Sequence, residues 1–422
     1  MKIIKLLIIS ILLLLKVDVI FAEITIEKCQ DAARENYPLI RQYDLISRTK
    51  DYNLANANKN YLPQLSLSGK ASYQSDVTEL PISVPGIQVD PLSKDQYQAY
   101  LQINQTIWDG GITGSIKKTA KASALVDTAK IEIEMYLLKD RVNQLYFGIL
   151  LIREQKKQVN ILLDELSVNR KRIESYMQNG IANQSDVDAV KVEELGAAKQ
   201  MAELTARENA YINAMALVTG QTISINAEFA MPDASHYDSG LDANERPEIN
   251  FFEARKILHD SKKSAIVANT MPKVGAFLQG GYGRPALNML KNNFDPYYIA
   301  GVQATWNFGT YYTLNNELNK IKAEKQSLDA ERDTFEFNNN LQIISQLGEI
   351  KRLESLMEND DEIIALRSAI KKAAQVKLEN GTISVSDLLR EINNENMAMH
   401  DRALHAIQLL SAKYNLMILK NN

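Results

Sequence analysis

The sequence has little of the material from which disulfides, metal centres and catalytic sites are built. Its 422 residues include one cysteine, Cys29, and four histidines. One cysteine excludes an intrachain disulfide framework and a thiolate zinc cluster. The 48 basic and 52 acidic side chains leave a net charge of -4, which gives no reason to expect nucleic acid as a partner. The composition therefore favours a structural role over catalysis.

Catalytic motifs are also missing. The chain contains no His-Glu-x-x-His, no Gly-x-Ser-x-Gly and no phosphate-binding Gly-x-x-x-x-Gly-Lys-Ser/Thr. His400 and His405 are five residues apart on a predicted helix, and we interpret them as solvent-facing rather than as metal ligands. We interpret 360–362 as a solvated acidic patch. We therefore predict no enzymatic activity, no cofactor and no metal site, so that energy for any transport would come from a partner.

Long apolar runs are confined to the first segment. Lys2 and Lys5 precede an apolar stretch over 6–15, and Ala22 offers a small residue for cleavage. This pattern predicts a secretory signal peptide over 1–22. A membrane anchor is the alternative, but about ten apolar residues are too few to cross ~30 Å of hydrocarbon. No later stretch is long and apolar enough for a spanning helix, so a mature membrane protein would have to span by other means.

The chain consists of two related halves. Asn36-Tyr37-Pro38 corresponds to Glu245-Arg246-Pro247 at an offset of 209, and Asn179-Gly180 corresponds to Asn380-Gly381 at an offset of 201. Matches in the same order indicate internal duplication. We predict a first repeat over 23–221, a linker over 222–244 and a second repeat over 245–422.

Proline-free tracts predict a long helical hairpin in each half. All ten prolines lie within 38–91 or 232–296, and proline in a helix interior is strongly unfavourable. We predict hairpins over about 112–218 and 312–419, each turning at its Asn-Gly pair. The first has a heptad seam, and the seam of the second is rougher. The predicted seam residues are Leu138, Val142, Leu145, Ile149, Ile152, Val159, Leu163, Leu166, Ile173 and Met177, then Ile343, Leu347, Ile350, Ile363, Leu366 and Ile370.

Four segments alternate between apolar and polar residues. They cover about 65–75, 97–108, 274–282 and 297–307, and aromatic residues lie near their ends. Their length suits tilted strands that cross a membrane, with an aromatic girdle at each interface. A half-buried sheet in a soluble domain is the alternative. Four strands cannot close a membrane barrel, so spanning strands require several copies of the chain, without fixing their number.

This arrangement resembles the TolC family of outer-membrane efflux proteins. The most specific stretches are Glu245-Arg246-Pro247-Glu248-Ile249, Gln105-Thr106-Ile107-Trp108-Asp109-Gly110-Gly111, Trp306-Asn307-Phe308-Gly309 and the two hairpin turns. The resemblance implies a membrane α+β fold and a homotrimer with a 12-stranded β-barrel in the outer-membrane lipid, four strands coming from each chain. A long α-helical coiled-coil barrel would continue it into the periplasm. The loops 76–96 and 284–296 would face outside the cell.

The resemblance also implies candidate site residues. The turns Asn179, Gly180, Ile181 and Asn380, Gly381, Thr382 would form the periplasmic tip, where the family docks a periplasmic membrane-fusion adaptor. Asp186, Asp387 and Arg390 would be candidates for a lumen gate. Asn183-x-x-Asp186 and Ser384-x-x-Asp387 equally fit helix capping. Ile383 and Leu378 stand where the family's best-known member has gating arginine and tyrosine, and Arg390 stands where it has a second gate aspartate.

These observations together predict a passive exit duct. It would serve a tripartite efflux or type I secretion system, conducting substrates that an inner-membrane transporter and the adaptor deliver. The alternative is a secreted coiled-coil structural protein without a channel.

Overall fold

The computed structural model describes residues 23–78, 91–233 and 246–420. The predicted signal peptide, 1–22, and residues 234–244 of the predicted linker lie outside these residues. The chain forms two compact units, and helices α4 and α7 contribute residues to both. Unit 1 comprises Met1–Arg41, Ile131–Pro247 and Thr334–Asn422, and unit 2 comprises Gln42–Lys130 and Glu248–Asp333.

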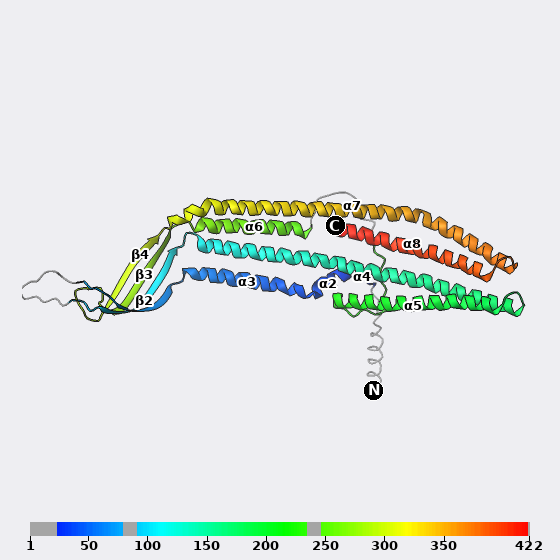
Figure 1. Ribbon diagram of the computed structural model, residues 1–422, viewed down its shortest axis with the longest axis horizontal. Coiled ribbons are helices and arrows are strands. Elements are labelled where there is room, and N and C mark those ends of the chain that lie inside the picture. The colour runs from blue at the N-terminus through cyan, green and yellow to red at the C-terminus, as the bar shows by residue number, and fades with distance from the viewer. Residues whose placement is uncertain (1–22, 79–90, 234–245, 421–422) are drawn as a thin grey trace, which may run out of the picture. The chain divides into compact units, whose positions relative to one another are not determined.

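Unit 2 contains the four predicted strands in one antiparallel sheet (Figure 1). The strands are β1 (Gln64–Tyr73), β2 (Asp95–Trp108), β3 (Lys273–Arg284) and β4 (Asp295–Thr305). Their order is β1-β2-β3-β4, so the two halves of the chain meet at the β2–β3 pair. Strands of 10 to 14 residues have the length that a tilted membrane strand needs.

The rest of the described chain is mainly helical. The helices are α2 (Ile26–Asn36), α3 (Arg41–Asn58), α4 (Ile112–Gln178), α5 (Gln184–Thr219), α6 (Pro247–Ala268), α7 (Tyr311–Glu379) and α8 (Val385–Lys420), with short 3-10 turns at Pro38–Ile40, Lys59–Tyr61 and Phe308–Thr310. Of the described helices, none combines the length and apolar character needed to cross a bilayer.

The heptad seam predicted for α4 is buried in unit 1. Val142, Ile149 and Leu166 are fully enclosed, and they belong to apolar clusters that α4 forms with α5 and α8. Burial of one stripe along a long helix is what heptad spacing favours. The two predicted hairpins are therefore α4–α5 and α7–α8.

The seam predicted for α7 is only partly right. Ile343 and Ile350 are buried, but Ile363, Leu366 and Ile370 are exposed. The buried stripe continues instead through Leu353, Asp360, Ala374 and Leu378, and the half-buried Lys371 lies beside it. The prediction failed because Asp360 and Lys371 lie along this stripe and contact polar or charged side chains of neighbouring helices, described below.

Side chains beside Pro38 and Pro247 form hydrogen bonds at the ends of the hairpins. The Asn36 amide donates to the carbonyl oxygens of Leu217 and Val218, at the end of α5. In the second repeat the Arg246 guanidinium donates to Asn339 Oδ1 at 3.0 Å, and the Asn339 amide donates to the Leu419 carbonyl near the end of α8. Unpaired carbonyls at helix ends are thus satisfied by side chains in both repeats.

Candidate functional site

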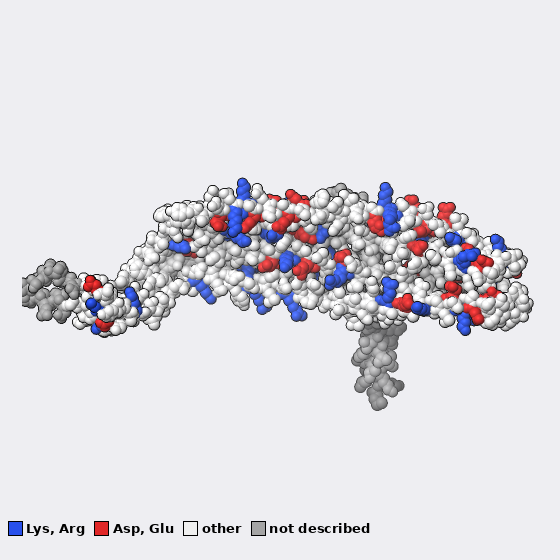
Figure 2. All heavy atoms as spheres, viewed as in Figure 1, with Lys and Arg blue, Asp and Glu red and all other residues white. Residues whose placement is uncertain are grey.

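One face of the sheet is apolar and exposed. The register pairs Leu67 with Leu101, and it continues the same row through Gly280 to Tyr298. Alternate residues of a strand share a face, so this face carries the apolar members of all four strands. Leu67 is 78% exposed, Tyr298 77% and Val302 72%. Figure 2 shows the sheet surface almost without charged side chains.

The opposite face is polar but contains aromatic rings. It carries mainly hydroxyl and amide side chains, namely Ser66, Ser68, Ser72, Gln98, Gln102, Asn104, Gln279, Gln303 and Thr305. The ring of Tyr297 lies over Gly281, where an added Cβ would be 2.6 Å from the ring. Phe277 lies over Gly301 in the same way, at 2.9 Å. Glycine is needed at both positions because the rings occupy the space of a side chain.

Both edges of the sheet lack a partner strand within the described residues. β1 pairs only with β2, and β4 pairs only with β3. An edge strand presents a row of free amide and carbonyl groups. In hydrocarbon each unsatisfied group is unfavourable by several kcal/mol, so a lipid-facing sheet of this kind has to be completed by another strand.

Aromatic and capping side chains join the sheet to the helices. The Trp306 indole Nε1 donates to the Thr270 carbonyl at 3.0 Å, and the Tyr311 hydroxyl donates to the same oxygen at 3.2 Å. The Asp109 carboxylate accepts bonds from the main-chain N–H groups of Gly111 and Thr113 and so caps α4. The Trp-Asp-Gly-Gly stretch noted in the sequence is therefore a strand end followed by a helix cap.

The two hairpin turns have the same geometry. Gly180 and Gly381 have φ angles of 75° and 65°, the left-handed region that favours glycine. Ile181 N–H donates to Tyr176 O, and Thr382 N–H donates to Lys377 O, both at 2.9 Å. This is the Schellman pattern that ends a helix. The predicted tip residues thus form two equivalent turns, and Ile181 and Thr382 are both exposed.

The candidate gate aspartates both cap helices. Asp186 accepts from the Asn183 N–H at 3.0 Å, and Asn183 Oδ1 accepts in return from the Asp186 N–H. Asp387 forms the same reciprocal box with Ser384. The capping interpretation is therefore confirmed for both residues.

The structure brings Asp387 and Arg390 together but leaves Asp186 apart from them. Arg390 Nη2 lies 3.1 Å from Asp387 Oδ1. Hydrogen bonds from Ser384, aided by the charge of Arg390, lower the pKa of Asp387. Asp186 bonds within its own box, and the described residues contain no ion pair between it and Arg390. Leu378 and Ile383, at the other gate positions, belong to the apolar core below the turns.

Two charged clusters of unit 1 were not predicted from the sequence. Lys371 on α7 contacts Glu165 on α4 at 2.7 Å and also pairs with Glu395 on α8. Burial alone would lower the pKa of Lys371, but the hydrogen bonds that its ammonium donates to the two carboxylates raise it on balance.

The second cluster corrects two interpretations. Asp360 is buried, and its carboxylate lies 2.8 Å from Nδ1 of His405. Asp360 is thus not part of a solvated patch, and His405 is not solvent-facing. Heptad spacing could have predicted that Asp360 is buried, because it lies seven residues after the buried Leu353. No three histidine, cysteine or acidic side chains within 23–78, 91–233 and 246–420 are arranged to hold a metal ion.

Comparison with known protein families matches one continuous part of the chain. Residues 30–221 match the profile of a family described as outer membrane efflux protein. Over these residues the chain is similar to the outer membrane efflux protein family. The family consists of outer-membrane channels rather than enzymes, so this efflux protein lies in the outer membrane and extends into the periplasm. Comparison with curated protein sequences gives no match.

Solved structures extend the likeness of fold to nearly the whole efflux protein. VceC of Vibrio cholerae matches with a TM-score of 0.66 and 13% identity, covering 94% of this chain and 96% of VceC. The CmeC channel of Campylobacter jejuni gives 0.63 and 14%, covering 93% and 85%. The MtrE channel of Neisseria gonorrhoeae gives 0.63 and 16%, covering 94% and 88%. The fold of four strands and long helical hairpins is therefore that of these channels.

Proposed function

We propose that this efflux protein is the outer-membrane exit duct of a tripartite efflux or type I secretion system. It conducts substrates passively after an inner-membrane transporter and a periplasmic adaptor deliver them. The observation that carries the proposal is the sheet. Its exposed apolar face suits lipid, and its two unpaired edges suit a neighbouring copy.

An exposed apolar stripe on α7 also supports assembly of several copies. On α7 the exposed residues Phe337, Leu341 and Ile344 are spaced by four and three residues, and Leu356, Ile363 and Ile370 by seven. Heptad spacing on an exposed face suits packing against another helix. In a homotrimer with a 12-stranded barrel, neighbouring copies would pair the sheet edges and cover this stripe. This assembly agrees with the family resemblance.

The hairpin turns are the proposed docking surface for the adaptor. Each turn presents an exposed side chain, Ile181 or Thr382, beside a glycine that ends the helix. Substituting both with glutamate would reduce the adaptor recovered on co-purification from producing cells. Val192→Glu, at an exposed position within α5, is the matched control. Equal recovery with all variants would contradict docking at the turns.

The proposed gate is formed by Asp186, Asp387 and Arg390. In a trimer, three copies of Asp387 would bring like charges to the lumen, where a pair about 6 Å apart repels by roughly 3 kcal/mol at an effective dielectric near 20. Arg390, already paired with Asp387 within the chain, would offset part of this repulsion. Such a ring attracts cations.

Planar-bilayer recording tests the duct. The protein should require detergent during purification and should conduct ions in bilayers. A coiled-coil structural protein would do neither, so a monodisperse monomer in plain buffer would exclude the duct.

Substitution at Asp387 tests the gate separately. Asp387→Ala should change single-channel conductance and weaken block by cations. Asp387→Asn keeps an acceptor for the helix cap but removes the charge, and it should have the same effect. Asp188→Ala, at an exposed position near the start of α5, is the control. Unchanged conductance and cation block in both Asp387 variants would exclude the gate.

A further inference from the structure

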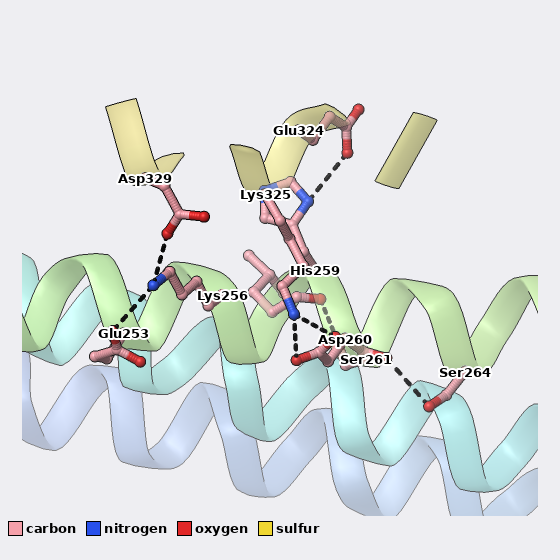
Figure 3. Close-up of polar contacts among 10 residues, drawn as sticks. Glu253, Lys256, His259, Asp260, Ser261, Ser264, Glu324, Lys325 and Asp329 are labelled. Atoms are coloured by element: carbon pink, nitrogen blue, oxygen red, sulfur yellow. Dashed lines mark hydrogen bonds and ion pairs between the residues drawn. The ribbon is translucent and has the colours of Figure 1, made fainter. Parts of the chain in front are cut away.

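Charges on α6 and α7 are matched in pairs over part of unit 2. Figure 3 shows Lys256 between Glu253 and Asp329, with its ammonium 2.8 Å from Asp329. One turn along α6, Lys325 of α7 donates to Asp260 at 3.0 Å, and His259 Nδ1 lies 3.0 Å from Glu324. In this stretch each basic side chain faces an acidic one.

The pairing stops toward the sheet. Six lysines lie within the ten residues of α4, α6 and α7 nearest the strands. They are Lys117, Lys118, Lys121, Lys262, Lys263 and Lys320. We call them the lysine cluster. None of the six makes an ion pair in the part of the chain that the structure describes. Five are exposed and Lys117 is partly so. The acidic residues of the same segments are Asp260, which is paired, and Glu317.

The lysine cluster lies just beyond a group of exposed aromatic residues. Trp108, Trp306 and Tyr312 are 43%, 49% and 87% exposed, and they lie where the strands meet the helices. Exposed tryptophan and tyrosine at strand ends suit the boundary between hydrocarbon and headgroups. At 1.5 Å per residue, the six lysines lie roughly 7 to 14 Å along their helices from the ends that adjoin the strands.

These distances place the lysine backbones at the outer boundary of a bilayer and just beyond it. The headgroup layer on each side of the hydrocarbon is about 5 to 7 Å thick. A lysine side chain can extend its ammonium toward such a layer while its stem lies along the protein. Lysines near a lipid surface attract anionic headgroups.

We infer that the lysine cluster binds anionic phospholipid headgroups of the periplasmic leaflet. The inference rests on the proposed function, in which the sheet spans the outer membrane. The cluster extends over three helices at a similar distance from the strands, and this suits a planar layer of phosphates better than a single acidic peptide. Lys117 and Lys121, four residues apart, share one face of α4 and can contact one headgroup together.

Boundary-lipid selectivity tests the inference. The full-length oligomer is reconstituted in phosphatidylcholine vesicles that contain spin-labelled phosphatidylglycerol or spin-labelled phosphatidylcholine. The spectrum then gives the preference of the protein boundary for the anionic lipid. Lys117→Gln/Lys118→Gln/Lys121→Gln should lower the preference, by about fivefold for each lysine that contacts a given lipid site. High salt should reduce the wild-type preference, since the Debye length falls to about 3 Å at 1 M.

Two control proteins separate charge at this site from charge in general. The triple arginine variant at positions 117, 118 and 121 should keep the preference. Lys171→Gln/Lys191→Gln/Lys372→Gln changes the net charge equally near the hairpin turns and should also keep it. An equal loss in both glutamine triples, or no loss in either, would overturn the inference. The inference would also be overturned if the glutamine triple at positions 117, 118 and 121 changed ion selectivity but not lipid preference. That result would indicate that these lysines face the lumen.

Conductance distinguishes this inference from the proposed duct. A protein that conducts in phosphatidylcholine bilayers without preferring phosphatidylglycerol contradicts the lipid site alone. A protein that prefers phosphatidylglycerol at its boundary but never conducts contradicts the duct alone.

Discussion

The ammonium of Lys371 on α7 lies 2.7 Å from the carboxylate of Glu165 on α4. It also pairs with Glu395 on α8, which is buried. One lysine therefore connects three helices, two from the second repeat and one from the first. Because Lys371 and its carboxylate partners come from both hairpins, each hairpin depends on the other to neutralise these charges.

We expect Lys371→Met to destabilise the protein by roughly 3 kcal/mol, because it leaves the buried carboxylate of Glu395 without a compensating charge. Unfolding by denaturant in detergent measures the effect. Lys372→Met, at the exposed neighbouring position, should change stability little. Adding Glu395→Gln to Lys371→Met should recover part of the loss, and a larger loss would show that the carboxylate is not the cause.

The sheet and the first hairpin could be predicted from the sequence because each has one consistent pattern. Alternation in the strands follows from an apolar face that all four strands share, as at Leu67 and Tyr298. The α4 seam follows from apolar residues at heptad spacing, such as Val142 and Ile149. In both cases the hydrophobic pattern and the local propensity agree.

The second hairpin could not be fully predicted because its apolar pattern has two faces. Ile363 and Ile370 have the spacing of a core seam, yet they lie exposed, where the proposed neighbouring copy would cover them. The core positions beside them carry Asp360 and Lys371, whose partners His405 and Glu165 come from other helices. Such pairs depend on tertiary packing and leave no local signal.

Acid should weaken the ion pairs that Glu208 makes with Arg153 and Lys156. This buried carboxylate accepts bonds from Arg153 at 2.7 Å and Lys156 at 2.8 Å. Burial alone would raise the pKa of Glu208, but these bonds lower it on balance. A lowered pKa gives stability that is present above the ordinary glutamate value of about 4.3 and is lost as pH falls through the folded value.

Glu208→Gln should therefore lower the free energy of unfolding at pH 7 by roughly 2 kcal/mol and flatten its decline below pH ~4.3. Unfolding curves at several pH values measure both effects. Glu203→Gln serves as the control, since that exposed residue contacts Lys199 only at 3.9 Å. If the free energy of unfolding of Glu208→Gln declined with acid as steeply as that of the wild type, other groups would cause the acid sensitivity.

Alanine at the turn glycines should strain the backbone without crowding it. An added Cβ at Gly180 or Gly381 would meet nothing within 4 Å, but both residues have left-handed φ angles. We expect each substitution to destabilise by about 1 to 2 kcal/mol. Gly196→Ala within α5, where the space is equally open and φ is ordinary, should stabilise by up to about 1 kcal/mol. Thermal unfolding compares them, and equal effects at all three positions would contradict the role of φ.

An arginine introduced on either face of the sheet tests most directly which face contacts lipid. Leu67 and Ser68 are neighbours near the middle of β1, and they point to opposite faces because side chains alternate along a strand. If the apolar face contacts lipid, Leu67→Arg should destabilise the protein in vesicles by about 2 to 4 kcal/mol. Ser68→Arg adds the same charge to the polar face, where water can solvate it, and should have a much smaller effect. Unfolding from phosphatidylcholine vesicles measures both variants. A larger loss for Ser68→Arg would reverse the assignment of the faces and, with it, the proposed direction in which the strands close around the lumen.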